Sequence, residues 1–284
     1  MKKVLITGAN SYIGTSFEKY VKENNVDFEI DTLDLLDPNW ENYDFLGYDS
    51  VFHVAGIAHF SKDESKKELY YKVNTELTEH VAKIAKKAGV RQFIFMSSII
   101  VYGDSSSSER IITKDTVPSP SDFYGDSKWQ AEQRLEKLVG DNFRVVILRP
   151  PMIYGKGSKG NYPKLSKVAQ KTPIFPVFSN SRSMLHIDNL CEFIKQIIDL
   201  ELSGLFCPQN SEYVNTSKLV EAIAEVHGKK IYFTKTFNPI IKFFFHLDTV
   251  KKVFGNLVYE KEMSRYTFEY QINNFEETIR LTEE

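Results

Sequence analysis

Short apolar runs alternate with longer amphipathic stretches through the first half of the chain. The apolar runs have the length of strands and cover residues 4–7, 28–33, 50–54, 92–97 and 144–148. The amphipathic stretches have the length of helices and cover residues 15–24, 69–88 and 124–138. Strands that alternate with helices predict an α/β fold, in which a doubly wound parallel sheet has helices on both faces. Ligands are then expected at the edge where the carboxyl ends of the strands meet.

The pattern becomes irregular beyond Pro150, where glycines and prolines interrupt the chain. We expect this part to form a smaller C-terminal lobe that binds the substrate. The predicted division is a dinucleotide-binding domain at residues 1–154 and 183–200, and a substrate-binding lobe at residues 155–182 and 201–284. An amphipathic last helix is assigned to the same lobe.

The most apolar stretch of the C-terminal part runs from Ile240 to Leu247 and includes three consecutive phenylalanines. Two interpretations are open: contact with a membrane surface, or a helix buried in the lobe. The buried helix is favoured, because apolar stretches of this length more often belong to a core.

Composition and charge narrow the class of partner. The 284 residues carry a formal net charge of -2, with basic and acidic residues interspersed, so we expect a small-molecule ligand and no nucleic acid. The two cysteines, Cys191 and Cys207, form no motif typical of a disulfide framework or a zinc site. No metal is expected, and a reducing cytoplasm fits this composition best. No apolar run reaches the length of a membrane span, and the N-terminus lacks the pattern of a signal peptide.

A glycine-rich turn from Gly8 to Gly14 follows the first strand. Glycines allow the backbone to approach a pyrophosphate closely, and the helix that follows offers N–H groups and the positive end of its dipole. Ser11 occupies the middle position of the Gly-x-x-Gly-x-x-Gly frame, which is a mild departure. The turn predicts a Rossmann-type dinucleotide site.

An acidic residue at the end of the second strand discriminates between cofactors. Asp34 lies about 20 residues beyond the turn, where a carboxylate binds the adenosine ribose hydroxyls and repels a 2'-phosphate. Asp31 is a rival for this role. We therefore expect NAD, with NADP as the alternative.

Tyr124 and Lys128 lie four residues apart, a spacing that places both side chains on one face of a helix. We expect the ammonium to stabilise a phenolate and so lower the pKa of Tyr124, which is ordinarily near 10. Such a tyrosine can exchange a proton with an alcohol or a ketone. Ser98, directly after an apolar strand, completes the candidate catalytic set.

Six motifs in sequence order resemble the extended short-chain dehydrogenase/reductases of the epimerase/dehydratase family. They are Thr7-Gly8-x5-Gly14, His53-Val-Ala-Gly56, Val73-Asn74-Thr75, Ser97-Ser98-x-x-Val101-Tyr102-Gly103, Tyr124-x-x-x-Lys128 and Arg149-Pro-Pro-x-Ile-Tyr-Gly155. Within this family, residues 149–155, 160–162 and 180–190 are similar to bacterial 4-keto-sugar reductases of capsule and O-antigen synthesis.

The resemblance implies roles for individual residues. Ser98 binds the sugar C4 oxygen, Tyr124 is the acid/base, and Lys128 holds the nicotinamide ribose. Asn161 and Arg182 match positions that bind the diphosphate of a UDP-sugar, whereas His186 and Asp188 are interpreted as structural. The implied cofactor-binding positions are Gly8, Asn10, Ser11, Tyr12, Ile13, Gly14, Asp34, His53, Ala55, Gly56, Asn74, Lys128 and Pro151.

One departure from the family selects among reactions. The 4,6-dehydratases have two acidic residues directly after the active-site Ser or Thr, and this chain has Ile99 and Ile100 there. Alkyl side chains exchange no protons, so dehydration is not expected. Reduction of a UDP-4-keto-6-deoxy-N-acetylhexosamine is the favoured reaction. A UDP-sugar 4-epimerase is the alternative, and a non-catalytic dinucleotide-binding sensor or scaffold is the third reading.

The resemblance also implies an assembly. Residues 69–88 and 124–138 match the helices that pair across a two-fold axis in the family, which predicts a homodimer built on a four-helix bundle.

Overall fold

The computed structural model describes residues 1–58 and 63–284 of the protein. The chain forms two compact units. The first comprises residues 1–103, 117–150 and 191–208, and the second comprises residues 104–116, 151–190 and 209–284. The assignment of substrate binding to the second unit stays a prediction.

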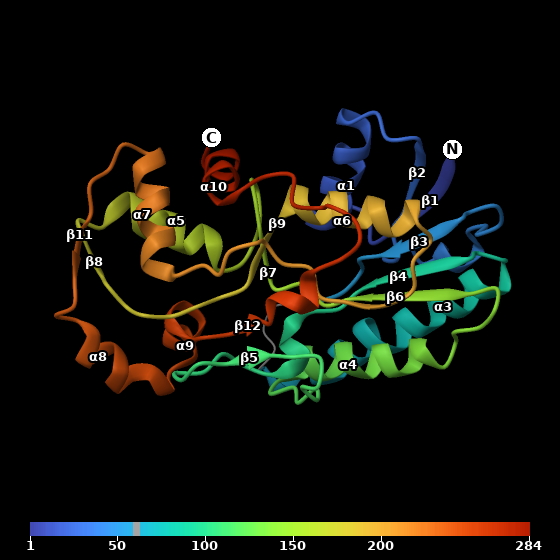
Figure 1. Ribbon diagram of the computed structural model, residues 1–284. Helices are drawn as coiled ribbons and strands as arrows, with labels where there is room; N and C mark the ends of the chain where they lie inside the picture. The colour runs from blue at the N-terminus through green and yellow to red at the C-terminus, as the bar shows by residue number, and fades with distance from the viewer. Residues whose placement is uncertain (59–62) are drawn as a thin grey trace. The chain divides into compact units, whose positions relative to one another are not determined.

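A six-stranded parallel sheet forms the centre of the first unit (Figure 1). Its strands are β1 (Lys2–Thr7), β2 (Phe28–Leu33), β3 (Ser50–His53), β4 (Gln92–Met96), β6 (Arg144–Leu148) and β10 (Gly204–Phe206). The five strands predicted from apolar runs are confirmed to within two residues at each end, and β10 was not predicted. The spatial order is β10-β6-β4-β3-β1-β2, so the direction of winding reverses between β1 and β3. That reversal is the point at which open α/β sheets bind ligands.

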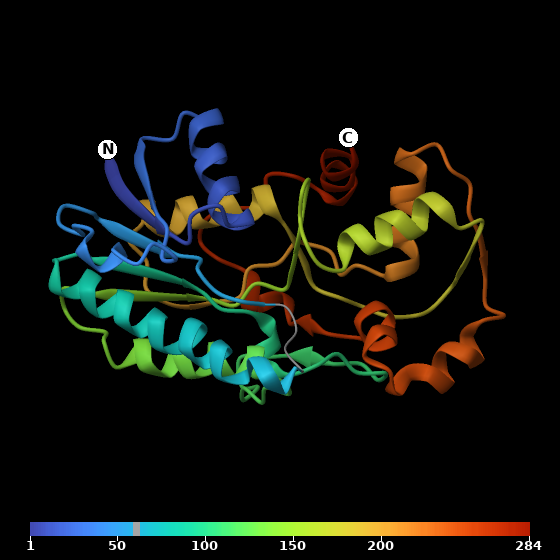
Figure 2. The same cartoon turned by 180° about the vertical axis from the view of Figure 1, so that it is seen from behind.

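Helices cover both faces of this sheet (Figures 1 and 2). On one face lie α1 (Tyr12–Glu23) and the part of α6 (Ile187–Asp199) that begins at Cys191. These two helices are joined by Tyr20, whose hydroxyl donates to Glu192 over 2.6 Å. On the other face lie α3 (Thr78–Lys87) and α4 (Phe123–Glu136). The predicted doubly wound α/β fold is confirmed.

The second predicted helix is continuous but not uniform. It consists of α2 (Lys67–Tyr70), a π-helical segment η3 (Tyr71–Leu77) and α3. π-Helical turns are rare and often occur at functional sites. Short 3-10 turns elsewhere are η1 (Trp40–Asn42), η2 (Glu64–Lys66), η4 (Ile99–Tyr102), η5 (Phe244–His246) and η6 (Lys261–Ser264).

The core of the first unit lies on both sides of the central strands. All five residues of β4 are buried, which explains why this strand is a continuous apolar run rather than an alternating one. Phe93 packs with Phe143, and Phe17 of α1 meets Phe52 of β3 edge-on at 5.6 Å between ring centres.

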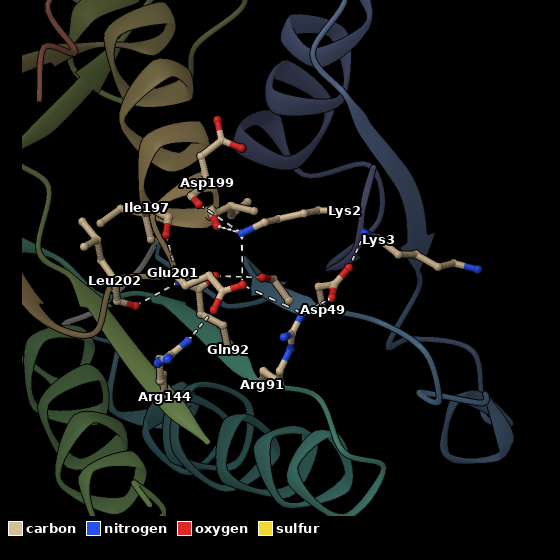
Figure 3. Close-up of polar contacts among 12 residues, drawn as sticks. Lys2, Lys3, Asp49, Arg91, Gln92, Arg144, Ile197, Asp199, Glu201 and Leu202 are labelled. Carbon is tan, nitrogen blue, oxygen red and sulfur yellow. Dashed lines mark hydrogen bonds and ion pairs between the residues drawn. The ribbon is translucent and has the colours of Figure 1, made fainter. Parts of the chain in front are cut away.

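A polar network joins the amino ends of the strands (Figure 3). Arg91 pairs with Asp49 over 2.5 Å, and Arg144 pairs with Glu201 over 2.6 Å. Gln92 donates to the main-chain oxygens of Ile197 and Leu202, both over 2.9 Å. This network lies at the edge of the sheet opposite the carboxyl ends, so its role is to hold strands together.

Three parallel strand pairs and five helices make up the second unit. The strands are β5 (Ile111–Ile112) with β12 (Val258–Tyr259), β7 (Met152–Tyr154) with β9 (Met184–His186), and β8 (Ile174–Pro176) with β11 (Tyr232–Thr234). The helices are α5 (Tyr162–Lys171), α7 (Thr216–Val226), α8 (Asn238–Phe243), α9 (Asp248–Phe254) and α10 (Phe275–Glu283). Apolar side chains of α5, α7 and α10 share one core with those of β7.

The expected last helix is confirmed as α10. It begins where Asn274 and Glu277 form a reciprocal capping box. Across the part of the chain that the structure describes, no helix is long and apolar enough to cross a membrane.

The stretch from Ile240 to Leu247 is not the buried helix that the sequence favoured. It forms α8 and η5, of which only Ile241 and Phe245 are buried. Ile240 remains 56% exposed and Phe243 remains 73% exposed. Phe178, Val250 and Phe254 pack with Ile241 and Phe245, while the other apolar side chains of the segment stay partly or largely exposed.

Candidate active site

The glycine turn begins where β1 ends. Gly8 has φ of +107°, and a Cβ there would come within 2.7 Å of the Ala55 nitrogen. The main-chain nitrogens of Gly8 and Ala9 donate to Leu33 at the end of β2, over 3.0 and 3.3 Å. Asn10 also has a positive φ, of 63°. The turn is thus held tightly between β2 and the residues after β3, and only glycine fits at its first position.

The structure gives a reason for a serine, rather than a glycine, at position 11. It is the N-cap of α1, and its side chain accepts a hydrogen bond from the Gly14 nitrogen over 3.1 Å. A Cβ on Gly14 would come within 2.7 Å of the Ser11 oxygen. Tyr12 and Ile13 form the first turn of α1, where helix N–H groups are available to an anion.

The two rival acids have different surroundings. Asp31 lies within β2, where it accepts a hydrogen bond from Tyr48 over 2.6 Å and faces Lys3 at 3.7 Å. Asp34 follows the end of β2, next to the main-chain oxygen that binds the glycine turn, and is exposed. The Asp34 carboxylate accepts a hydrogen bond from the Leu36 nitrogen over 2.9 Å and is otherwise open to solvent, and its role as the ribose-binding acid stays a prediction.

His53 is buried within the sheet rather than facing the turn. Its ring lies between Thr7 and Thr78, at 2.7 and 3.0 Å, and stacks on Phe93. Burial, with a contribution from Lys128, lowers the pKa of His53 to about 3. The imidazole is therefore neutral over the physiological range, and His53 shapes the end of β3.

Asn74 lies on the π-helical segment and holds the backbone of Ile57, four residues after β3. Its side chain exchanges two hydrogen bonds with the backbone of Ile57, over 2.9 and 3.0 Å, and donates to Ser127 of α4 over 3.0 Å. A Cβ on Gly56 would meet the Asn74 oxygen at 2.9 Å and the Lys128 nitrogen at 3.0 Å. Gly56, Asn74 and Lys128 thus enclose one small space.

Tyr124 and Ser98 come together from two elements. Tyr124 is in the first turn of α4, and Ser98 caps η4 directly after β4. The main-chain nitrogen of Ile99 donates to Pro150 after β6 over 2.9 Å, which holds the Ser98 backbone at the carboxyl edge of the sheet. Hydrogen bonding with Ser98 acts to lower the pKa of Tyr124.

The expectation that Lys128 acidifies Tyr124 is wrong for the protein chain alone. Burial raises the pKa of Tyr124 to about 12, and Asp122 and Tyr70 act in the same direction. The Lys128 ammonium instead donates to the Met96 oxygen over 2.8 Å and lies 4.6 Å from the centre of the Phe95 ring. The helix places both residues on one face, but the lysine bonds to the strand below it.

The second unit holds the two predicted diphosphate residues. Arg182 lies between Val214 and Leu257, and its Nη1 donates to Gly255 over 3.3 Å. Its Nε is buried with no hydrogen-bond partner among the described residues, and burial lowers the pKa of Arg182 to about 10. Asn161 is the N-cap of α5, and its side chain makes no capping bond. A half-buried guanidinium whose Nε has no partner among the described residues is an arrangement that an anionic ligand would complete.

The remaining predicted positions lie on or beside β7 and β9. His186 ends β9, where burial lowers its pKa to about 4, and Asp188 lies 3.7 Å from its ring. Pro151 directly precedes β7.

Comparison with known proteins assigns the family. The sequence profile of the NAD dependent epimerase/dehydratase family matches residues 4–204. This chain belongs to that family. The resemblance of the six sequence motifs to the epimerase/dehydratase family is confirmed, as is the expectation of an NAD(P)-dependent enzyme.

Individual relatives include two epimerases. The chain is 32% identical to a UDP-glucose 4-epimerase of Vibrio cholerae, over 78% of this chain and 75% of that protein. It is 29% identical to an N-acetyl-alpha-D-glucosaminyl-diphospho-ditrans,octacis-undecaprenol 4-epimerase of Escherichia coli O157:H7, over 80% and 73% of the two chains. In fold it is similar to a dTDP-4-dehydrorhamnose reductase of Clostridium acetobutylicum, with a TM-score of 0.76 and 19% identity over 98% and 97% of the chains.

The geometry fits the dinucleotide that this epimerase/dehydratase family uses. The space that a Cβ on Gly8 would fill, the first turn of α1 and the exposed Asp34 lie at the reversal of winding between β1 and β3. Gly8 to Gly14 would hold the pyrophosphate, and Asp34 the adenosine ribose. When bound, NAD(P) supplies or accepts the hydride.

The sequence analysis did not identify a buried hydrogen-bonded network that lies beside the candidate catalytic residues. The Arg149 Nε donates to both Glu132 oxygens, over 3.0 and 3.2 Å, and its Nη1 donates to the Tyr102 hydroxyl over 2.6 Å. Ser97 also donates to Glu132. The network thus ties α4 to the ends of β4 and β6, which carry the candidate catalytic residues. The spacing of Glu132, four residues beyond Lys128 and eight beyond Tyr124, is the signal that would have found it.

Burial of Lys128 predicts that the free energy of unfolding depends on pH. Burial lowers the pKa of Lys128 from 10.5 to about 7. Between these values the unfolded chain binds a proton that the folded chain has released, so the free energy of unfolding rises with pH across this window. Lys128→Met is expected to remove that rise, at most about 1.4 kcal/mol per pH unit. Chemical denaturation at about pH 7 and about pH 9 measures it.

The matched control is Lys19→Met, which alters an exposed lysine of α1. This variant is expected to keep the wild-type increase. If the free energy of unfolding of Lys128→Met rises with pH as much as that of the wild type, Lys128 is not the group responsible.

Proposed function

We propose that the protein reduces C4 of a UDP-4-keto-6-deoxy-N-acetylhexosamine with NADH or NADPH, in the synthesis of a surface polysaccharide. The observation that carries the proposal is the meeting of Ser98 and Tyr124 at the carboxyl edge of the sheet, with Lys128 one turn further along α4. Ser98 binds the C4 oxygen, Tyr124 donates a proton to it, and Lys128 positions the nicotinamide ribose. Hydride reaches C4, and the ketone becomes an alcohol.

The protonation state of Tyr124 is compatible with the reductive direction. Because the pKa of this phenol is raised to about 12, it is protonated near neutral pH. Reduction of a ketone needs a proton donor at the oxygen, whereas oxidation of an alcohol needs a base. A protonated Tyr124 therefore begins the reduction in the required state.

Substrate binding is proposed for Arg182 and Asn161. The half-buried Arg182 guanidinium, whose buried Nε has no partner among the described residues, is suited to pair with diphosphate oxygens. Ile99 and Ile100 offer no groups for proton exchange, so the proposal excludes 4,6-dehydration.

A UDP-sugar 4-epimerase is the second candidate. The Vibrio cholerae and Escherichia coli relatives favour it, because both are 4-epimerases. The same three residues serve it, since an epimerase also moves hydride at C4. A homodimer built through the helices of residues 67–87 and 123–136 and a cytoplasmic location also stay proposals.

One assay separates the two reactions. Purified protein is mixed with NADH or NADPH and a UDP-4-keto-6-deoxy-N-acetylhexosamine, and separately with UDP-GlcNAc and NAD. The proposal expects depletion of the reduced cofactor in the first mixture and no 4-keto-6-deoxy product in the second. Interconversion of UDP-GlcNAc and UDP-GalNAc without depletion in the first mixture would favour the epimerase. Release of a 4-keto-6-deoxy sugar from UDP-GlcNAc would contradict the exclusion of dehydration.

A further inference from the structure

An apolar patch on the second unit has no role in the proposed reaction. It consists of the exposed side chains of Phe237, Ile240, Phe243, Phe244 and Leu247, on and beside α8 and η5. Figures 1 and 2 show α8 at the periphery of that unit. An exposed apolar cluster of this kind marks an interaction surface rather than chance exposure.

The segment that carries the patch is packed against the second unit through two buried side chains. Ile241 and Phe245, four residues apart on the same segment, are buried with Phe178. The rings of Phe178 and Phe245 stack with centres 6.3 Å apart. The exposed residues at 240, 243, 244 and 247 recur three or four residues apart along α8 and η5, which places them on one side of this segment.

The charge around the patch is basic. Residues 235–252 contain four lysines, Lys235, Lys242, Lys251 and Lys252, against a single acidic residue, Asp248. Lys242 is exposed and lies between Ile240 and Phe243 in the sequence. The basic character of this segment is local, because the chain as a whole has a net charge of -2. A short helix with protruding phenylalanines and flanking lysines has the chemistry of a segment that lies in the interface of an anionic membrane.

We propose that the patch docks the protein on an anionic lipid surface, with Phe243 and Ile240 entering the headgroup region and Lys242 meeting lipid phosphates. Charge complementarity selects this occupant over a second copy of the chain, because two basic patches repel each other. The inference does not depend on which C4 reaction the protein performs, because docking requires no turnover.

Co-sedimentation of the full chain with vesicles tests the proposal. Binding is expected to vesicles of phosphatidylcholine with phosphatidylglycerol, to be weaker on pure phosphatidylcholine, and to fall at high salt. Phe243→Glu is expected to weaken binding to the anionic vesicles about tenfold or more, because the ring no longer enters the interface. Since Phe243 is 73% exposed, the variant is expected to keep the wild-type melting temperature.

The matched control is Leu46→Glu, which changes an apolar side chain that is 71% exposed in the first unit. It is expected to bind vesicles as the wild type does. Absence of wild-type binding, or equal losses in both variants, would overturn the proposal. So would a change of oligomeric state in Phe243→Glu with unchanged vesicle binding, because the patch would then be a protein interface.

Discussion

Tyr124→Phe is expected to lower kcat by about 10²–10⁴-fold, the range ordinarily lost with a general acid. The phenol is the proposed proton donor to the C4 oxygen, and phenylalanine keeps the ring while removing the proton. Binding of NADH is expected to stay within about twofold of wild type, because the glycine turn and Asp34 are untouched. Cofactor depletion at 340 nm measures turnover, and fluorescence of bound NADH measures binding.

A second tyrosine supplies the matched control for this prediction. Tyr71 is half-buried on η3, and its hydroxyl donates to Asp126 over 2.7 Å. Tyr71→Phe also removes one phenolic hydroxyl near α4, but not the proposed acid, so turnover is expected to persist. Comparable turnover in both variants would assign the proton transfer to another group.

Removing the carboxylate of Glu132 is expected to lower the free energy of unfolding by about 3–5 kcal/mol, the usual cost of leaving a buried charge without its partner. Glu132→Gln keeps the shape of the side chain, yet leaves the Arg149 guanidinium buried beside an uncharged amide. Urea denaturation at neutral pH measures the loss. The exposed pair Lys19–Glu23 provides the control, since Glu23→Gln is expected to cost less than about 1 kcal/mol.

The double variant Glu132→Met/Arg149→Met separates charge from packing. It removes both ions and fills similar volume, so it is expected to recover most of the stability lost in Glu132→Gln. A double variant as unstable as the single one would show that packing, rather than an unpaired charge, accounts for the loss.

The central strands of the sheet were predictable because they are buried on both faces. β4 and β6 are continuous apolar runs that end in polar residues, and such runs have few other interpretations. The glycine turn was predictable for a related reason: Gly8 adopts a φ that other residues avoid. Local sequence is informative where local geometry restricts the choice of residue.

The electrostatics of Tyr124 and Lys128 were not predictable from their spacing. Helical periodicity places both side chains on one face of α4, but the partner of Lys128 is a main-chain oxygen, at Met96. No side-chain pattern encodes that contact. The pKa of Tyr124 is dominated by burial, which depends on how α4 packs and not on the residue four positions away.

The exposure of Phe243 was also not predictable from the sequence. An apolar run predicts burial only where the fold supplies enough neighbours to cover it. Ile241 and Phe245 have such neighbours in Phe178 and Phe254, whereas Ile240 stays 56% and Phe243 73% exposed.

Transfer of deuterium tests the central claim most directly. The protein is supplied with a UDP-4-keto-6-deoxy-N-acetylhexosamine and with NADH or NADPH labelled by deuterium at C4 of the nicotinamide, each cofactor and each labelled face in a separate reaction. The account predicts that NMR will find deuterium on C4 of the product sugar for one of the two labelled faces. A product without deuterium at C4 for both faces, or no product at all, would contradict it.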